Sequence, residues 1–144
     1  MKKKLTEQQK KSKLRKRCVT LAKLIVRKRA GFRCVKCGQG EPQKQTQGSH
    51  IYPEGRYTSM SADIDNILCL CAGCHMWSND SWHENPLESA EWFHKKYPDL
   101  YLTLKERSRK SVVMTLRDWE NKYAELSCID KLLTSDYKES SIEI

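Results

Sequence analysis

Apolar residues recur at helical spacing near the start of the chain. Four of them fall at positions i, i+4, i+7 and i+11, and therefore on one narrow stripe of a helix: Leu14, Cys18, Leu21 and Ile25. Thr6 followed by Gln9 has the pattern of a capping box, and Gly31 is a residue at which helices commonly end. The sequence therefore predicts a helix over residues 7–29.

A second helical stripe lies near the other end of the chain, formed by Val112, Leu116, Trp119, Tyr123 and Leu126. This spacing predicts a long amphipathic helix that packs on the core. Residues 85–88 (Asn-Pro-Leu-Glu) are typical of a helix start, with Asn at the cap and Pro at the first position. That helix is expected to run to Tyr97 and to end at Pro98. Leu100, Leu102 and Leu104 alternate over a run too short to distinguish strand from helix.

Two short strands are expected between these helices. The candidates are residues 49–52 (Ser-His-Ile-Tyr) and 67–70 (Ile-Leu-Cys-Leu). Residues 38–48 form a polar loop without periodicity, residues 56–65 form an irregular connector, and a further helix is expected from about Ala72. The fold class that follows is α+β, with a small core and flanking α-helices.

The composition allows only a small core. The chain has 144 residues, 38% hydrophobic content and a mean hydropathy of −0.76. We divide it into a basic N-terminal helical arm (1–30), a core (31–97), a C-terminal helical extension (98–134) and a tail (135–144). Because no run of 18 apolar residues and no apolar leader segment is present, we expect no membrane partner and a cytoplasmic protein.

The positive charge is concentrated in the first quarter of the chain. Residues 1–36 contain 15 Lys and Arg and one acid, a net charge of +14, whereas residues 37–144 contain 12 Lys and Arg and 17 acids, a net charge of −5. Such asymmetry favours a polyanion such as DNA as the partner of the N-terminal helix. The candidate DNA-binding residues there are Arg15, Lys16, Arg17, Arg27 and Lys28. The alternative is a charge run that is only solvated.

The cysteines form two close pairs. Cys34 and Cys37 make one CxxC pair, and Cys71 and Cys74 make another about 35 residues later. Two residues between cysteines let both sulfurs turn toward one ion, so two such pairs predict a closed, structural Zn²⁺ site. The alternative is a set of unrelated reduced thiols. The three other cysteines are expected to be small apolar packing residues: Cys18, Cys69 and Cys128.

Three further residues lie between and beside these pairs: His50, then Asn66 sixteen residues later, then His75 after another nine. This order and spacing resemble the HNH endonucleases, the ββα-metal nuclease class. The runs Gly-Ser-His-Ile-Tyr (48–52), Arg-Tyr-Thr-Ser (56–59), Cys-Ala-Gly-Cys-His (71–75) and Asn-Pro-Leu-Glu (85–88), with Trp92, look like small phage proteins related to the NinG (Rap) recombination nucleases. The resemblance covers about residues 30–120 and is most specific over residues 48–75.

The resemblance implies a zinc-stabilised ββα-metal (HNH) core over residues 31–97. In this family the first histidine ends a strand and is the general base, which here is His50. Asn66 then holds the connector between the strands, and His75, on the following helix, binds a catalytic divalent ion. Phosphodiester hydrolysis needs an activated water and a cation at the phosphate, so we expect Mg²⁺ or Mn²⁺ there.

Two residues compete as the second ligand of that ion. Relatives often carry a ligand four residues after the position of His75, which is Asn79 here, and His83 follows after four more. All three share one face of an unbroken helix. The segment 76–82 is about one helical turn longer than in the relatives, which slightly favours His83.

The chain matches the relatives at one further position and departs from them at two. Arg56 corresponds to the first arginine of their motif, and it is expected to grip a phosphate with both ends of its guanidinium. Ser49 stands where many HNH sites have Asp or His before the base. Ser61 and Ala62 stand where a further arginine is expected. His94 is expected to be a surface histidine.

The sequence therefore leaves competing functions. The first is a phage-encoded, metal-dependent DNA endonuclease that nicks or cuts duplex or branched DNA in the cytoplasm of a bacterial host. The alternative is a zinc-stabilised DNA-binding protein whose HNH core has lost catalysis. Intact His50, Asn66 and His75 favour the first, and Ser49 and the missing arginine favour the second. A third possibility, an adaptor that binds protein through its C-terminal helix, predicts no DNA affinity. Nothing in the sequence specifies an oligomeric state.

Overall fold

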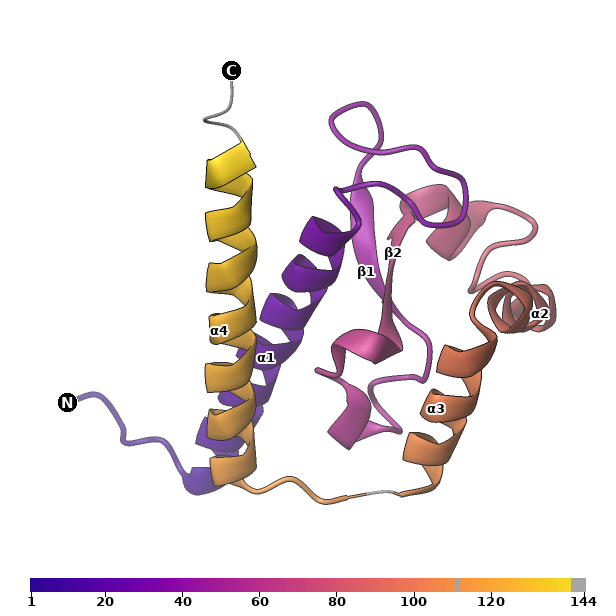
Figure 1. Ribbon diagram of the computed structural model, residues 1–144. Coiled ribbons are helices and arrows are strands. Elements are labelled where there is room, and N and C mark those ends of the chain that lie inside the picture. The colour runs from indigo at the N-terminus through magenta and orange to yellow at the C-terminus, as the bar shows by residue number, and fades with distance from the viewer. Residues whose placement is uncertain (111, 141–144) are drawn as a thin grey trace.

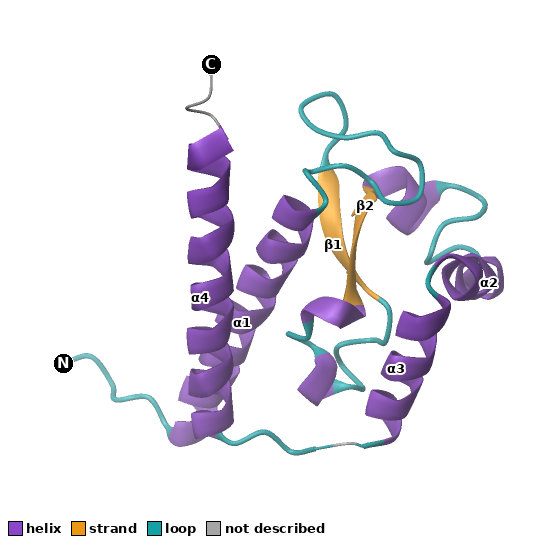
Figure 2. Cartoon of the chain, in the orientation of Figure 1, coloured by secondary structure: helices purple, strands orange, loops and turns teal. Residues whose placement is uncertain are grey.

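The computed structural model describes residues 1–110 and 112–140 and has an α+β fold built on a small two-stranded sheet (Figure 1, Figure 2). The strands and α-helices are α1 (Glu7–Arg29), β1 (Thr46–His50), β2 (Ile67–Cys71), α2 (Pro86–Lys96), α3 (Pro98–Arg109) and α4 (Leu116–Ser140). Two 3-10 turns, η1 (Thr58–Met60) and η2 (Ile64–Asn66), lie in the connector between the strands, and a π-helical turn, η3 (Gly73–Trp77), follows β2. In the predicted tail, α4 continues to Ser140, and residues 141–144 lie outside the described residues.

Helix α1 begins and ends where the sequence predicts. Thr6 and Gln9 form the capping box: the Gln9 backbone N–H donates to the Thr6 hydroxyl (3.2 Å), and the Thr6 N–H donates to Gln9 Oε1 (2.9 Å). After Arg29 the chain leaves the helix through Gly31, whose φ of +61° is easily adopted only without a Cβ. Local sequence signals therefore suffice to define this helix.

The first strand differs from the prediction. It spans Thr46–His50 and not residues 49–52, because its five residues pair antiparallel with all five of β2, from Thr46 opposite Cys71 to His50 opposite Ile67. Pairing stops at His50 because the Asn66 side chain bonds the backbone N–H of Tyr52 (2.8 Å) and its C=O (3.0 Å). A strand neighbour cannot use those two groups as well.

The sheet lies between two helical layers, with α1 and α4 on one side and α2 and α3 on the other (Figure 1). Alternate residues of β2 face opposite layers, as strand geometry requires. Ile67 packs into the α1–α4 cluster, while Leu68 and Leu70 pack into the cluster on the α2–α3 side. The two apolar clusters are small and separate, so the sheet is the element that joins them.

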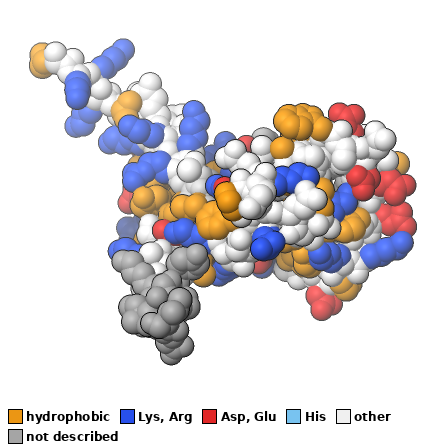
Figure 3. Space-filling view, turned by 90° about the horizontal axis from the view of Figure 1, so that it is seen from above, with side chains coloured by type: hydrophobic (Ala, Val, Ile, Leu, Met, Phe, Trp, Pro, Cys, Tyr) orange, Lys and Arg blue, Asp and Glu red, His pale blue; other side chains and the backbone are white. Residues whose placement is uncertain are grey.

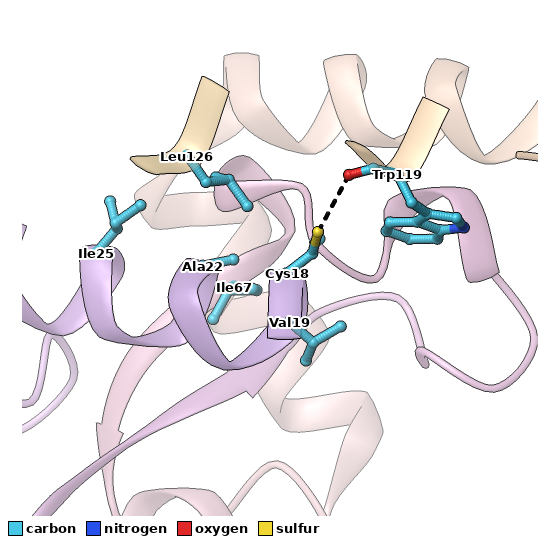
Figure 4. Packing of buried hydrophobic residues seen from close by; sticks show 8 residues of the cluster. Cys18, Val19, Ala22, Ile25, Ile67, Trp119 and Leu126 are labelled. Carbon is cyan, nitrogen blue, oxygen red and sulfur yellow. Dashed lines mark hydrogen bonds between the residues drawn. The ribbon is translucent and has the colours of Figure 1, made fainter. Parts of the chain in front are cut away.

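The α1–α4 cluster confirms the first helical stripe and, of the second, Trp119, Tyr123 and Leu126. Val112 was wrongly assigned to that helix, because it lies before α4 and is 59% exposed. Five of its residues are nearly or fully inaccessible: Cys18, Ala22, Ile25, Trp119 and Leu126 (Figure 4). The Cys18 thiol contacts the Trp119 carbonyl oxygen at 3.5 Å, which ties α1 to α4. The C-terminal helix thus packs on the core. None of the helices among the described residues is both long and apolar enough to cross a membrane.

The region after η3 is also helical. Asn85 caps α2 through a bond from the Glu88 N–H to Asn85 Oδ1 (3.3 Å), as the sequence predicts. Pro98 ends α2 but also opens α3, because a proline needs no backbone donor at the first helical position. The leucine alternation that follows is helical: Leu104 is buried, whereas Leu102 is 61% exposed.

Helix α1 crosses β1 at Gly48. A larger side chain at this position tests how closely the helix and the strand pack. A Cβ on Gly48 would lie 2.5 Å from Cγ and 3.1 Å from Cα of Lys23, closer than packed carbons approach. We expect Gly48→Ala to lower the free energy of unfolding by about 1–3 kcal/mol, the usual cost of overpacking, measured by denaturant titration. Gly55→Ala is the matched control, because nothing lies within 4 Å of a Cβ there. Equal unfolding midpoints for the two variants would contradict the crossing.

Candidate functional site

The four paired cysteines converge on one point. Their sulfurs all lie within 4.8 Å of one another, and Sγ of Cys37 and Sγ of Cys71 are 3.7 Å apart. A zinc ion with four sulfurs at about 2.3 Å in tetrahedral geometry places the sulfurs about 3.8 Å apart. The donor set and the spacing both fit structural Zn²⁺, with no fifth position for a substrate. This is the only group of three or more metal-ligating side chains within the described ranges 1–110 and 112–136.

The first pair sits in a tight turn. The Cys34 N–H donates to the Gln39 carbonyl (2.8 Å), and the Gly38 N–H donates back to the Cys34 carbonyl (2.8 Å). Gly38 has a φ of +77°, which lets the chain reverse directly after Cys37. The Val35 N–H bonds the carbonyl of a β2 residue, Cys69 (2.9 Å), so the turn is fixed to the sheet.

The second pair joins the sheet to η3. Cys71 is the last residue of β2, and Cys74 lies in η3, where its N–H points at the Cys71 sulfur (3.4 Å). Burial alone would raise the pKa of Cys34, but backbone N–H groups, among them those of Cys37 and Cys71, lower that pKa to about 7. Burial and the neighbouring sulfurs raise the pKa of Cys74. A bound zinc ion would favour the thiolate form of its ligands, because the metal binds cysteine as the thiolate.

The three remaining cysteines lie outside this cluster. Cys18 and Cys69 are buried packing residues, as predicted, and burial raises the pKa of both thiols. Cys128 differs from the prediction because it is exposed on α4. Its position on α4 lies outside the apolar stripe of that helix, to which the buried residues Trp119 and Leu126 belong.

His50 ends β1, and one of its ring nitrogens is fixed by the connector. Its Nε2 lies 2.7 Å from the carbonyl oxygen of Ser61. A carbonyl only accepts hydrogen bonds, so Nε2 carries the proton and Nδ1 keeps its lone pair. The imidazole is thereby oriented with a basic nitrogen on the side away from Ser61.

Asn66 is the side chain that shapes the connector. It is fully buried, and its amide makes three bonds: it accepts from Tyr52 N (2.8 Å) and donates to the carbonyls of Tyr52 (3.0 Å) and Met60 (3.1 Å). Met60 directly precedes Ser61, so this amide helps to position the carbonyl that orients His50. It does so from inside the protein, without an exposed surface of its own.

His75 lies in η3, with a partner at each ring nitrogen. Its Nδ1 is 2.7 Å from Gln47 Oε1, and its Nε2 is 3.1 Å from Nε2 of His83. Two imidazoles that bind one ion at about 2.1 Å place their nitrogens about 3.0–3.4 Å apart, so the pair has the spacing of two metal ligands. Burial, followed by the charges of His83, Lys23 and His50, lowers the pKa of His75. The ring therefore stays neutral to lower pH and can offer a lone pair to a cation.

The unbroken helix expected after His75 is not formed. The π-helical turn ends at Trp77, because Ser78 is extended (ψ 156°), and the chain returns so that the His83 N–H bonds the His75 carbonyl (3.1 Å). Lys36 stabilises this return by bonding the Asp80 carbonyl (2.6 Å) and carboxylate (3.3 Å). His83 thus reaches His75 through a turn.

Asn79 does not take part in this pairing. It lies exposed in the turn that follows η3, and helical geometry no longer places it on the face of His75. Of the two residues that the sequence offered as a second ligand, the structure brings His83 to His75 and leaves Asn79 apart. His94 is exposed on α2, and its ring stacks on Tyr101 with 4.1 Å between centroids.

Some of the cations predicted to contact DNA are engaged within the protein. Arg27 pairs with Glu41 (Nη2–Oε2 3.0 Å), and Lys28 pairs with Asp130 (Nζ–Oδ1 2.6 Å). These pairs fix the C-terminal end of α1 to the loop before β1 and to α4. They leave less charge there for a polyanion than the sequence implies.

The N-terminal half of α1 reaches the connector. Arg15 donates to the Glu54 carbonyl (Nη2–O 3.0 Å) and to the Ser61 hydroxyl (Nε–Oγ 3.4 Å). A guanidinium from α1 thus lies beside the connector residue at which the resemblance leads one to expect an arginine. Lys16 is exposed on α1, and Arg56 is exposed on the connector.

Sequence reasoning missed two side chains of this site. Gln47 bonds His75, and Lys23 lies where α1 crosses β1, near enough for its charge to lower the pKa of His75. Gln47 stands in a stretch with other glutamines, and Lys23 is one of 15 cations in residues 1–36. No local pattern distinguishes either residue, since only the crossing of α1 and β1 brings them to the histidines.

Comparison of the chain with known protein families, with curated proteins and with solved structures finds no match. The site is therefore interpreted from its own geometry.

The cysteine cluster predicts that each chain binds one zinc ion and that the free energy of unfolding of the protein depends on this ion. We expect Cys37→Ser to lose the metal and to unfold at much lower denaturant, since structural zinc contributes on the order of 10 kcal/mol of binding free energy. Metal analysis together with denaturant titration checks this. Cys128→Ser is the matched control, because both side chains are exposed and substitution disturbs little packing. A zinc content equal in Cys37→Ser and the parent protein would contradict the cluster.

Proposed function

We propose that the chain is a metal-dependent DNA endonuclease of the HNH type, with its site where β1, the connector and η3 meet. The observation that carries the proposal is the histidine pair, with Nε2 of His75 and Nε2 of His83 only 3.1 Å apart. The order of a strand, a connector held by Asn66, a second strand and a helical turn supports it, because this is the order of a ββα-metal core.

His50 is the general base in this proposal. Its Nε2–H is fixed by the Ser61 carbonyl, so Nδ1 is the nitrogen that takes the proton from the attacking water. A neutral imidazole is a suitable general base for this step at physiological pH. Asn66 is a positioning residue, since it shapes the connector without reaching the substrate.

His75 and His83 would hold the divalent ion. An ion there supplies Lewis-acid stabilisation of the scissile phosphate and of the departing 3′ oxygen. Gln47 Oε1 accepts from Nδ1–H of His75, which directs the lone pair of Nε2 toward the shared position. Because the pair is made of imidazoles without a carboxylate, it favours Mn²⁺ over Mg²⁺.

DNA is the proposed substrate because of where the charge lies. Lys and Arg side chains gather at the end of the molecule that holds the N-terminal segment, whereas Asp and Glu gather at the opposite end, toward α2 (Figure 3). On α1, Lys16 and Arg17 are exposed, and Arg17 lies over the Tyr123 ring, 4.5 Å from its centroid. Each phosphate neutralised there adds about 0.9 to the salt dependence of duplex binding.

A second candidate is a DNA-binding protein with the same zinc-stabilised core but without catalysis. Two observations favour it. Ser49 is only 2% exposed, so it gives the ion no third ligand from β1, and no other metal-ligating group joins His75 and His83 within the part of the chain that the structure describes. Such a protein would bind duplex DNA and leave it intact with any divalent ion.

A plasmid-nicking assay in the presence of Mn²⁺ separates the two candidates. We expect the parent protein to relax supercoiled plasmid and His50→Ala to do so about 10²–10⁴ times more slowly, the usual contribution of a general base. His94→Ala, an exposed histidine on α2, is the control and should cut at the parent rate. Cutting that survives in His50→Ala would rule out the assigned base, and a parent protein that binds without cutting would favour the second candidate.

Manganese binding tests the histidine pair by itself. We expect His83→Ala to weaken Mn²⁺ binding about 10-fold or more and Asn79→Ala to leave it unchanged, because only His83 lies beside His75. Calorimetric titration of the zinc-loaded protein with Mn²⁺ gives the dissociation constants. If Asn79→Ala weakened Mn²⁺ binding and His83→Ala did not, Asn79 would be the ligand. The parent protein is also expected to nick faster with Mn²⁺ than with Mg²⁺.

A further inference from the structure

The side chain of Lys23 lies across β1 between the two histidine positions. A Cβ on Gly48 would lie 2.5 Å from Cγ, 2.7 Å from Cβ and 3.1 Å from Cα of Lys23, so only a glycine leaves room for this lysine. Gly48 directly follows Gln47, whose side chain bonds His75. His50 lies two residues after Gly48 on the same strand. The carbon stem of Lys23 therefore covers the part of β1 that links His75 to His50.

The directions of α1 and β1 determine where the ammonium group of Lys23 points. The helix and the strand run side by side in opposite directions (Figure 1), and Arg27, one turn after Lys23, bonds Thr46 (Nε–Oγ1 3.3 Å). Four helical residues rise about 6 Å and two strand residues about 6.6 Å, so one turn of α1 matches two residues of β1. The turn before Lys23 is therefore level with His50. Side chains of a helix point back toward its N-terminus, which directs Lys23 toward that level.

Lys23 also differs from the cations on either side of it along α1. Arg27 is paired with Glu41, and Arg15 donates to the carbonyl of Glu54. Lys23 is partly buried, yet within the described part of the chain it makes neither a hydrogen bond nor an ion pair. Its ammonium group is therefore available to an anion that reaches the site.

The histidine site lacks any other permanent positive charge close to the strand. The groups gathered there are the imidazoles of His50, His75 and His83 and the amide of Gln47. Phosphodiester hydrolysis increases the negative charge on the phosphate oxygens in the transition state, and a fixed cation beside them lowers the barrier. A compact ammonium group on a flexible stem is suited to this contact.

We infer that the ammonium group of Lys23 binds the DNA phosphate that the histidines act on. The inference rests on the proposed function, and it adds a substrate-binding side chain from α1 to a site otherwise built from the strands, the connector and η3. It also gives the close crossing at Gly48 a role, because a larger residue there would move the stem of Lys23 away from β1.

Duplex binding without added Mn²⁺ tests the phosphate contact separately from cleavage. Lys23→Met keeps a carbon stem over Gly48 and removes the charge, so it should unfold at the parent denaturant concentration. The slope of log K against log salt is expected to fall by about 0.9 in Lys23→Met, the loss of one phosphate contact. Lys131→Met removes the same charge from an exposed position on α4 and should keep the parent slope. A parent slope in Lys23→Met, or an equal fall in both variants, overturns the inference whether or not the protein cuts DNA.

Nicking with Mn²⁺ at saturating plasmid shows whether this phosphate is the one that is cut. We expect kcat to fall about 10²-fold in Lys23→Met, to recover in part in Lys23→Arg, which keeps the charge, and to stay at the parent value in Lys131→Met. A lowered salt slope with the parent kcat in Lys23→Met would place the contact away from the histidines and overturn the inference. A parent protein that never cuts, with the slope lowered only in Lys23→Met, would remove the endonuclease and keep the phosphate contact.

Discussion

The convergence of four sulfurs on one point is the constraint on which the rest of the structure depends. One pair comes from the loop after α1 and the other from the junction of β2 with η3, so an ion held between them would join the loop, the sheet and η3. The two apolar clusters on either side of the sheet are small. In a chain of this size, a zinc ion bound by the four sulfurs would supply part of the stability that a larger core otherwise provides.

The positions of the histidines depend on elements that are close to the cysteine cluster. Cys74 and His75 are neighbours in η3, so fixing the sulfur also fixes the imidazole beside it. On the other strand, the buried amide of Asn66 shapes the connector, and the connector carbonyl at Ser61 fixes one nitrogen of His50. The ring of His50 is thus oriented by a backbone carbonyl, and the ring of His75 by the side chain of Gln47.

Helix α1 contributes both apolar side chains to the core and cations to the surface. Its apolar stripe packs against α4 and the sheet, while its cations divide between contacts within the protein and exposed positions. Arg27 and Lys28 are ion-paired near its C-terminal end, whereas Lys16 is exposed nearer its N-terminus. The charge count alone therefore overstates how many cations of α1 are available to a partner, and most of the exposed ones lie in its N-terminal half.

The sequence predicts those features that depend on short-range signals. The bounds of α1 follow from its capping box and Gly31, and the sulfur cluster follows from two CxxC pairs. The start of β1 could not be predicted, because Gly48 is a poor strand former and its burial depends on the crossing of α1. His83 was favoured from the sequence, but its route to His75 was not predictable, because it depends on a turn stabilised by Lys36, which lies between Cys34 and Cys37.

Anomalous diffraction from crystals of the zinc-loaded protein grown with Mn²⁺ tests the central claim most directly. The account predicts a zinc peak equidistant from the sulfurs of Cys34, Cys37, Cys71 and Cys74. It also predicts a manganese peak that touches Nε2 of His75 and Nε2 of His83. Zinc bound away from the four sulfurs, or manganese absent from the histidine pair, would contradict it.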